Sequence, residues 1–188
     1  MGSEMCIRDR DVTVTDIDLN RLREIDILTR GTIKTIFPTP SAIYDQVAQS
    51  DVVVGAVLVA GAKAPKLISR EMVNNMNPGA VLIDVAIDQG GCVEGIRPTS
   101  HDSPAYTEND VLHYAVTNMP GIVGNMASTS LSNATLPYVK ILADEGVHQA
   151  IKQNSGLARG VSTFEGAITY KSLSESLELN YSELTGIL

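Results

Sequence analysis

The chain has 188 residues, of which 44% are hydrophobic and 19% are charged, a composition that suits a globular protein of one domain or slightly more. Its formal net charge of −8 argues against a nucleic-acid partner, since proteins bind the phosphate backbone through basic patches. No apolar run approaches the roughly 18 residues of a membrane helix and no secretory signal is evident, so we expect a cytoplasmic protein without a membrane partner.

The first ten residues, MGSEMCIRDR, differ from the rest of the chain because they lack periodicity and carry four charges. We predict that residues 1–10 are an artefact of the gene sequence or a disordered tail, and they are left out of the prediction of the fold. The two cysteines, Cys6 and Cys92, have no metal or redox spacing and are expected to be reduced thiols.

Strand and helix signals alternate over the first two thirds of the chain. The apolar run at residues 51–57 is nearly continuous, which is typical of a strand buried on both faces of a parallel sheet. The alternation predicts an α/β fold with a Rossmann-like, doubly wound parallel sheet over residues 11–127. The expected strands are 12–14, 34–36, 51–57, 80–85 and 111–116, and the expected helices are 20–29, 41–49 and 69–76.

The pattern changes after residue 127. A long helix is predicted over 128–144, with a kink at Pro137 and an end at Gly146. A short helix at 147–154, a strand or hairpin at 160–169 and a last helix at 172–177 follow. We interpret residues 128–188 as a linking helix and the C-terminal part of a second domain.

An acidic residue, Asp16, follows the first strand in the stretch VTVTDIDLNRLREI. Dinucleotide-binding folds place a carboxylate there to hold the adenosine ribose, and its charge would repel the 2′-phosphate of NADP, so Asp16 predicts NAD. Arg21 could reach the same ribose or the adenine. Alternatively, Asp16 is a solvated strand end, Asp18 is a helix N-cap and Arg21 is a surface arginine.

The glycine-rich turn that belongs with such an acid is not found. A Gly-x-Gly-x-x-Gly turn normally lies roughly 20 residues before the acid. Here fifteen residues precede Asp16, and none of the fifteen glycines forms a Gly-x-Gly pair. We therefore expect the downstream part of a nicotinamide-dependent enzyme whose sheet lacks its first strand. In a 3-2-1-4 sheet the strands at 12–14 and 51–57 would then each lose a neighbour, which exposes edges that promote aggregation.

The stretch LIDVAIDQGG places two aspartates at the end of a predicted buried strand. Ligands bind at the carboxyl ends of strands in open α/β sheets, so Asp88, at the strand tip, is the catalytic candidate. Asp84 is predicted to be structural and hydrogen-bonded within the turn. Gly90 and Gly91 would let the backbone approach a ligand, although a tight turn explains them equally well.

Two further strand ends offer binding residues. In VTNMPG, Asn118 could bind the nicotinamide amide or the substrate, and Met119 could pack on the ring or in the core. In GAVLVAGAKAPKL, Val57 and Leu58 could sandwich the adenine. No metal site is predicted, because the histidines have no metal or triad spacing; they are His101, His113 and His148.

Four stretches together resemble one family, the bacterial alanine dehydrogenases: VTVTDIDLNRLREID, GAVLVAGAKAPKLI, AVLIDVAIDQGGCVEGIRPT and NMPG. The similarity covers the NAD-binding half and the C-terminal return, from residue 11 almost to the end. The resemblance implies oxidative deamination of L-alanine to pyruvate and ammonia, hydride transfer to NAD and a homohexamer, with Asp88 as the catalytic aspartate. The cofactor-binding positions implied are Asp16, Arg21, Val57, Leu58, Val85, Ala86, Ile87, Asp88, Arg97, Val116, Thr117, Asn118 and Met119.

Several family features have no counterpart in this sequence. The family's catalytic histidine, substrate arginine and substrate lysine lie in an N-terminal domain outside this chain. Pro38 replaces a serine on the adenosine side, the loop at 121–127 departs from the family pattern, and a metal site would fall on Ile141 and Glu145, although isoleucine cannot ligate. We therefore expect the 188-residue chain to be marginally stable and to show no dehydrogenase turnover.

Three other interpretations remain open. The NAD-binding subunit of proton-translocating transhydrogenase is similar, but DQGG at residues 88–91 discriminates against it, since that relative has an E-A-G-G type of strand end. A non-catalytic NAD-binding or assembly module would use the same sheet without chemistry, and the absence of a glycine-rich turn favours it. A purely structural α/β domain fits the alternation alone. Titration with NADH would separate the binding module from the enzyme fragment, since a real module must bind NADH without the missing half.

Overall fold

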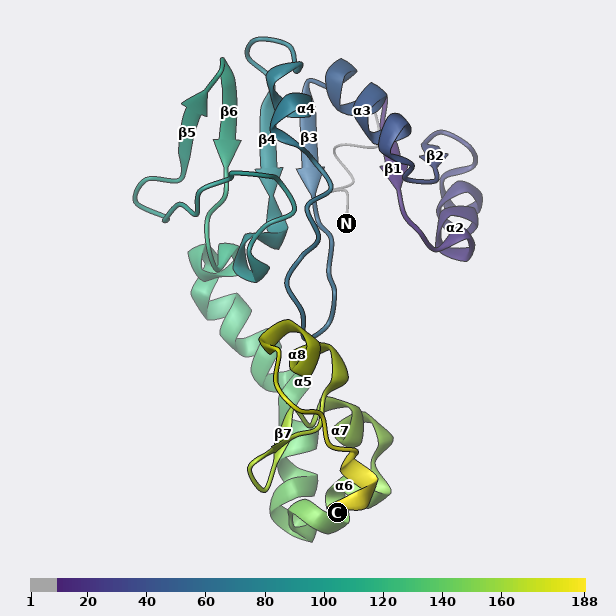
Figure 1. Cartoon of the computed structure of the whole chain (residues 1–188), viewed down its shortest axis with the longest axis vertical. Helices are drawn as coiled ribbons and strands as arrows, with labels where there is room; N and C mark the ends of the chain where they lie inside the picture. The colour runs from purple at the N-terminus through teal and green to yellow at the C-terminus, as the bar shows by residue number, and fades with distance from the viewer. Residues whose placement is uncertain (1–9) are drawn as a thin grey trace.

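The computed structural model describes residues 10–188, and its first part is a parallel sheet in two pieces (Figure 1). The sequence predicted residues 1–10 to be an artefact or a tail, and all of these except Arg10 lie outside the described residues. In the smaller piece β1 (Thr13–Thr15) pairs in parallel with β2 (Lys34–Ile36). In the larger piece the order is β3-β4-β6-β5, formed by Val52–Gly55, Val81–Asp84, Val111–Tyr114 and the antiparallel Ala105–Glu108.

The sheet is interrupted between β1 and β3. Within the described residues, β1 bonds only to β2, and β3 bonds only to β4. The helix α2 (Leu19–Thr29) connects β1 to β2, and α3 (Pro40–Gln49) returns the chain to β3. In a 3-2-1-4 sheet the first strand occupies this interruption. The α/β class with a parallel sheet, and the interruption at this place, are confirmed.

The core lies on one face of the larger sheet. Side chains alternate between faces along a strand, so Val53 and Leu82 point to the side covered by α3 and α4 (Arg70–Asn74). On the opposite face Val52 and Val54 are 55% and 57% exposed. The expectation that the apolar run is buried on both faces is therefore wrong, because the helices that pack against this core cover only one face of β3.

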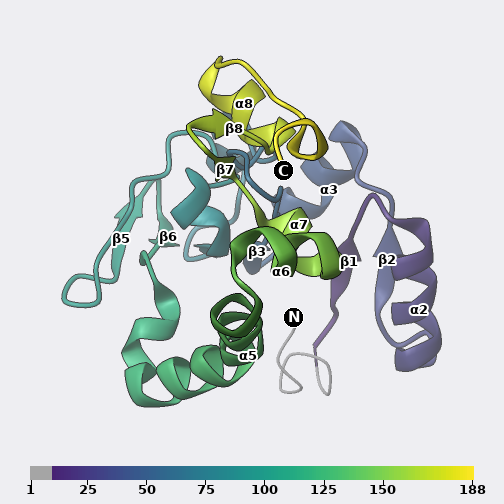
Figure 2. The ribbon, with the colours of Figure 1, turned by 90° about the horizontal axis from the view of Figure 1, so that it is seen from below.

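The second part of the chain is mainly helical. Figures 1 and 2 show α5 (Gly124–Glu145) carrying the chain away from the carboxyl ends of β4 and β6 to a smaller unit. No residue of α5 is buried, and Pro137 lies inside it. The remaining elements are η2 (Met119–Val123), α6 (Val147–Gln153), α7 (Ser155–Gly160), β7 (Thr163–Phe164), β8 (Ala167–Ile168), α8 (Lys171–Leu177) and η3 (Leu184–Gly186).

Most predicted elements are present with ends displaced by a few residues. The strand β2 has its predicted bounds, and the hairpin at 160–169 is present as β7 and β8. The sequence did not predict β5 or α7. The strand predicted at 80–85 ends at Asp84, where a 3-10 helix, η1 (Val85–Gln89), begins. Among the described residues, no helix is both long and apolar enough to span a membrane.

The open face of β3 gives a testable prediction. Val54→Lys is expected to change the free energy of unfolding by less than about 0.5 kcal/mol, since the side chain is exposed, and to reduce self-association of the apolar face. The matched control is Val53→Lys, which puts a charge against the core and is expected to cost about 2 kcal/mol or more. Urea unfolding and sedimentation velocity measure both effects. Equal destabilisation by the two substitutions would contradict the one-sided packing.

Candidate functional site

A buried carboxylate, Asp84, organises the turn that follows β4. Its side chain is fully buried, with Oδ1 accepting the N–H of Ala86 at 3.0 Å. Oδ2 accepts the N–H groups of Cys92 at 2.8 Å and Val93 at 3.2 Å. A buried carboxylate is stable when its lone pairs are satisfied in this way. The prediction that Asp84 is structural and hydrogen-bonded within the turn is confirmed.

The turn closes tightly around this carboxylate. Gly91 has φ +74°, and a Cβ at this position would lie 2.7 Å from Asp84 Oδ2, so no larger residue fits without a shift. The Cys92 thiol donates to Asp84 Oδ1 at 3.6 Å. Burial, followed by the charge of Asp84, raises the pKa of Cys92 to about 12. The thiol therefore stays protonated at neutral pH and takes part in packing.

Asp88 lies in the 3-10 helix η1 and its residue is exposed, so its predicted position at a strand tip is corrected. Its two carboxylate oxygens accept the backbone N–H of Asn118 at 3.0 and 3.2 Å. Asn118 follows β6, the neighbour of β4 in the sheet. The structure thus brings together two residues predicted from separate strand ends, and most of the acceptor capacity of Asp88 remains open to a ligand.

Asn118 is held from its other side by His101, for which no role was predicted from the sequence. Its φ of +50° is left-handed, and its carbonyl oxygen lies 3.0 Å from Nε2 of His101. A bond to a carbonyl requires the imidazole to donate from Nε2. The sequence contained no signal for this contact, since residues 101 and 118 are brought together only by the loop before β5.

The loop after β3 lies along the turn that follows Asp88. Backbone N–H groups of Ala64 and Leu67 donate to the carbonyl oxygens of Gln89 at 2.9 Å and Cys92 at 2.8 Å. Lys66 donates from Nζ to the carbonyls of the same turn. The sequence did not identify Lys66, because a lysine in a loop has no pattern of its own.

The residues predicted to flank the adenine differ in exposure. Val57 packs against the core cluster, whereas the Leu58 side chain is 74% exposed. At the tip of the same loop, a Cβ on Gly61 would lie 2.3 Å from the Tyr170 ring, so the loop contacts the residue that precedes α8 in the C-terminal part of the chain. The loop therefore joins the sheet to the second part of the chain.

Asp16 directly follows β1 in the smaller piece of the sheet, and Arg21 lies in the first turn of α2. Asp16 Oδ1 accepts the N–H of Asp18 at 2.8 Å, and Asp18 caps α2 by accepting from Asn20 at 2.9 Å. The N-cap interpretation of Asp18 is confirmed. Arg21 forms an exposed ion pair with Glu24. Neither residue forms a hydrogen bond or ion pair with Asp88, so their role at the ribose stays a prediction.

The other predicted cofactor residues fall into three groups. Arg97 is held on β5, with its guanidinium 4.2 Å from the centre of the Tyr106 ring and 3.6 Å from Glu108, and it does not join Asp88. Val85 is 46% exposed, Thr117 is exposed and Met119 is half-buried. The buried members are Ala86, Ile87 and Val116.

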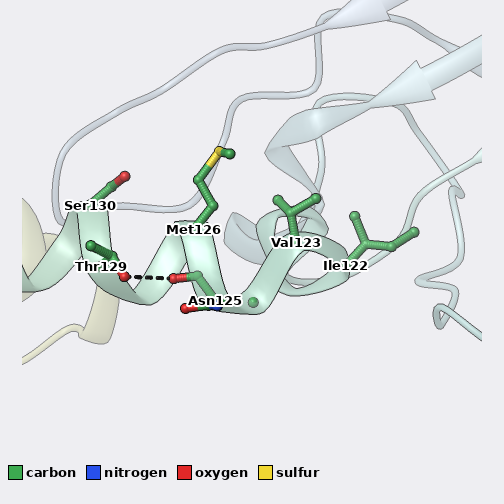
Figure 3. Close-up of a pocket in the computed structure, with 7 residues that line it drawn as sticks. Ile122, Val123, Asn125, Met126, Thr129 and Ser130 are labelled. Carbon is green, nitrogen blue, oxygen red and sulfur yellow. Dashed lines mark hydrogen bonds between the residues drawn. The ribbon is translucent and has the colours of Figure 1, made fainter.

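An open hollow of about 620 Å³ follows Asn118 along the chain, at the start of α5. Figure 3 shows that Ile122, Val123 and Met126 project to the same side of the ribbon, while Thr129 bonds back to the carbonyl of Asn125 at 2.9 Å. The apolar side chains are more than half exposed. The stretch at 121–127 that departs from the family pattern lines part of this hollow, and it is helical rather than a loop, since it lies in η2 and the first turn of α5.

The residues at the carboxyl ends of the strands fit a dinucleotide in their chemistry. Exposed apolar side chains at Leu58 and Val85 offer surfaces for planar rings, and the carboxylates of Asp16 and Asp88 offer acceptors for ribose hydroxyls and amide or amine groups. At Gly90 no atom lies within 4 Å of an added Cβ, so the backbone is open on this side.

Comparison with known proteins shows one family throughout. The family description "Alanine dehydrogenase/PNT, C-terminal domain" matches residues 6–171. Alanine dehydrogenase of Halomonas elongata is 45% identical over 178 residues, which is 95% of this chain and 48% of that protein. Alanine dehydrogenase of Mycobacterium tuberculosis is 46% identical over 177 residues, with 94% and 48% covered. The chain thus spans about half the length of the curated relatives it matches.

Solved structures agree with the sequence matches. A structure of L-alanine dehydrogenase superposes with a TM-score of 0.75 at 37% identity, covering 90% of this chain and 46% of that chain. The transhydrogenase from Sinorhizobium meliloti superposes with a TM-score of 0.65 at 22% identity, which shows a shared fold alone. These matches confirm the resemblance that the four sequence stretches indicated.

The network of Asp84 gives a second prediction. Asp84→Ala is expected to lower the free energy of unfolding by about 3 kcal/mol or more, since each buried donor left unsatisfied costs about 1–3 kcal/mol. Asp84→Asn is also expected to destabilise, because its NH₂ group would face N–H donors of the turn. Urea unfolding measures both, with the exposed Asp102→Ala as the control. A stable Asp84→Ala variant would show that the turn does not depend on this carboxylate.

Proposed function

Because this chain belongs to the family of the alanine dehydrogenase/PNT C-terminal domain, we propose that it forms the dinucleotide-binding part of an NAD-dependent alanine dehydrogenase. The observation that carries the proposal is the contact between the Asp88 carboxylate and the Asn118 backbone. It places an exposed acid at the carboxyl ends of two adjacent parallel strands, where open α/β sheets bind their ligands.

The binding roles follow from the positions of the residues. Asp16 and Arg21 would hold the adenosine ribose, and Val57 and Leu58 would flank the adenine. The nicotinamide half would lie against residues 85–88 and 116–119. Arg97 would have to leave Tyr106 and Glu108 to reach the ligand.

The proposed reaction is the oxidative deamination of L-alanine to pyruvate and ammonia. NAD supplies the hydride acceptor when it is bound. The Asp88 carboxylate would accept a hydrogen bond from the substrate nitrogen through the lone pairs that Asn118 leaves free. The Asn118 N–H would fix the carboxylate in one orientation, and the Asp84 network would hold the turn on which Asp88 lies.

The organisation of the chain supports a protein made of two parts. We assign residues 11–127 to the NAD-binding unit and 128–188 to a linking helix and part of a substrate domain. The exposed apolar side chains of α5, among them Leu131, Leu136 and Val139, favour association with further copies, up to the hexamer implied by the family. We also propose that the protein is cytoplasmic and has no nucleic-acid or membrane partner.

We further propose that this chain alone binds the dinucleotide without turning over L-alanine. Among the described residues, the Asp88 carboxylate accepts hydrogen bonds only from the backbone N–H of Asn118. No lysine or arginine in this described part of the chain forms an ion pair with Asp88, so no cation is held beside it that could bind the carboxylate of L-alanine. Incubation with L-alanine and NAD is expected to yield no NADH absorbance. Alanine-dependent NADH formation would refute this proposal and favour a complete active site. Absence of NADH binding as well would favour a structural domain.

The preference for NAD gives a prediction at Asp16. Asp16→Ala is expected to weaken NADH binding by about 10- to 100-fold, since charge-assisted hydrogen bonds contribute roughly 1.5–3 kcal/mol. NADPH binding should weaken less or improve, because the charge that repels the 2′-phosphate is removed. Fluorescence titration measures both, with Asp26→Ala on α2 as the matched control. Unchanged NADH affinity in Asp16→Ala would leave Asp16 as a solvated strand end.

A further inference from the structure

One cation joins the two loops at the proposed site. Lys66 Nζ donates to the carbonyl oxygens of Gly90 at 2.6 Å, Gly91 at 2.7 Å and Val93 at 3.2 Å. An ammonium has three N–H donors, so these three carbonyls use its full donor capacity. The Lys66 residue is exposed at the surface, yet its charged end is committed to a single turn.

The turn is therefore held by two opposite charges: a carboxylate binds its N–H groups, and an ammonium binds its carbonyl oxygens. The Asp84 carboxylate binds the N–H groups of Cys92 and Val93, while the Lys66 ammonium binds carbonyl oxygens of the same turn. Converging carbonyl dipoles repel one another unless a cation or donor lies between them. Gly90 and Gly91 have φ of +89° and +74°, a conformation whose carbonyl directions Lys66 can fix.

Asp88 lies two residues before Gly90, and its carboxylate reaches Asn118 across the end of the sheet. A shift of the turn by a few tenths of an ångström would misplace the carboxylate relative to a bound ligand. We propose that Lys66 is a positioning residue: it holds the turn that carries Asp88 in the orientation that receives the nicotinamide half of the cofactor. This inference rests on the proposed function, because it assigns that half to residues 85–88.

The alternative is a surface lysine that only joins two loops. The two roles differ in their effect on the two halves of the cofactor. A residue that orients the Asp88 turn affects NADH, which has a nicotinamide, and leaves ADP-ribose, which has none, unaffected. General damage to the fold affects both ligands alike.

The experiment is a calorimetric titration of the 188-residue chain and three variants with NADH and with ADP-ribose. Lys66→Met is expected to weaken NADH binding by about 3- to 10-fold, because Lys66 acts through the position of the turn and makes no bond to the ligand itself, with ADP-ribose affinity unchanged. Lys66→Arg keeps the charge and is expected to recover part of the NADH affinity. Lys63→Met, in the same loop, is the matched control, since Lys63 makes no hydrogen bond or ion pair among the described residues.

Each result decides between the two roles. Wild-type NADH affinity in Lys66→Met, or equal weakening of NADH and ADP-ribose, would overturn the positioning role while leaving the proposed function intact. If wild type binds neither ligand, the proposed function fails and this inference fails with it. If Lys66→Met does not fold, Lys66→Arg decides between the two roles. One nitrogen of a guanidinium cannot donate to three carbonyl oxygens as the ammonium does, so the positioning role predicts that Lys66→Arg binds NADH more weakly than wild type and ADP-ribose equally well.

Discussion

The candidate site depends on the burial of one carboxylate among backbone N–H groups. Asp84 is the last residue of β4, and its carboxylate oxygens accept the N–H groups of Ala86, Cys92 and Val93. The chain after Ala86 therefore turns back toward the sheet, so that Cys92 and Val93 reach the same side chain. The short helix η1 occupies the excursion between these contacts. Asp88 is exposed as a consequence, because it lies on the outer side of a turn whose inner side is filled by Asp84.

Two of the four stretches that carry the family resemblance are joined by hydrogen bonds into one unit. The loop GAKAPKL supplies backbone donors and the Lys66 ammonium, and the turn DQGGCV supplies the carbonyl oxygens that receive them. Residues 61–67 contain no helix or strand, and of residues 88–93 only the first two belong to one, the 3-10 helix η1. Each segment satisfies backbone groups of the other.

Local rules predicted much of this structure. The alternation of apolar runs and helical spacing gave the parallel strands, the aspartate before α2 gave its N-cap, and the polar group in a buried strand identified Asp84. Features set by distant contacts were not accessible. The partners of Arg97 lie on β5, and the Lys66 ammonium donates to a turn some 25 residues away. The 3-10 helix η1 replaces the end of a predicted strand because the Asp84 side chain caps this helix. The one-sided burial of β3 depends on which helices cover the sheet, which periodicity alone does not reveal.

The interrupted sheet separates the two ends of the proposed cofactor site. Asp16 follows β1, whereas Leu58, Asp88 and Asn118 follow strands of the larger piece, so one ligand must bridge both pieces for the assignment to hold. Amide NMR shifts of the chain on addition of NADH test this most directly. We expect shifts at Asp16 and at residues 58, 85–91 and 117–119 together, saturating at the same NADH concentration. Shifts restricted to one piece of the sheet, or confined to the hollow at the start of α5, would contradict it.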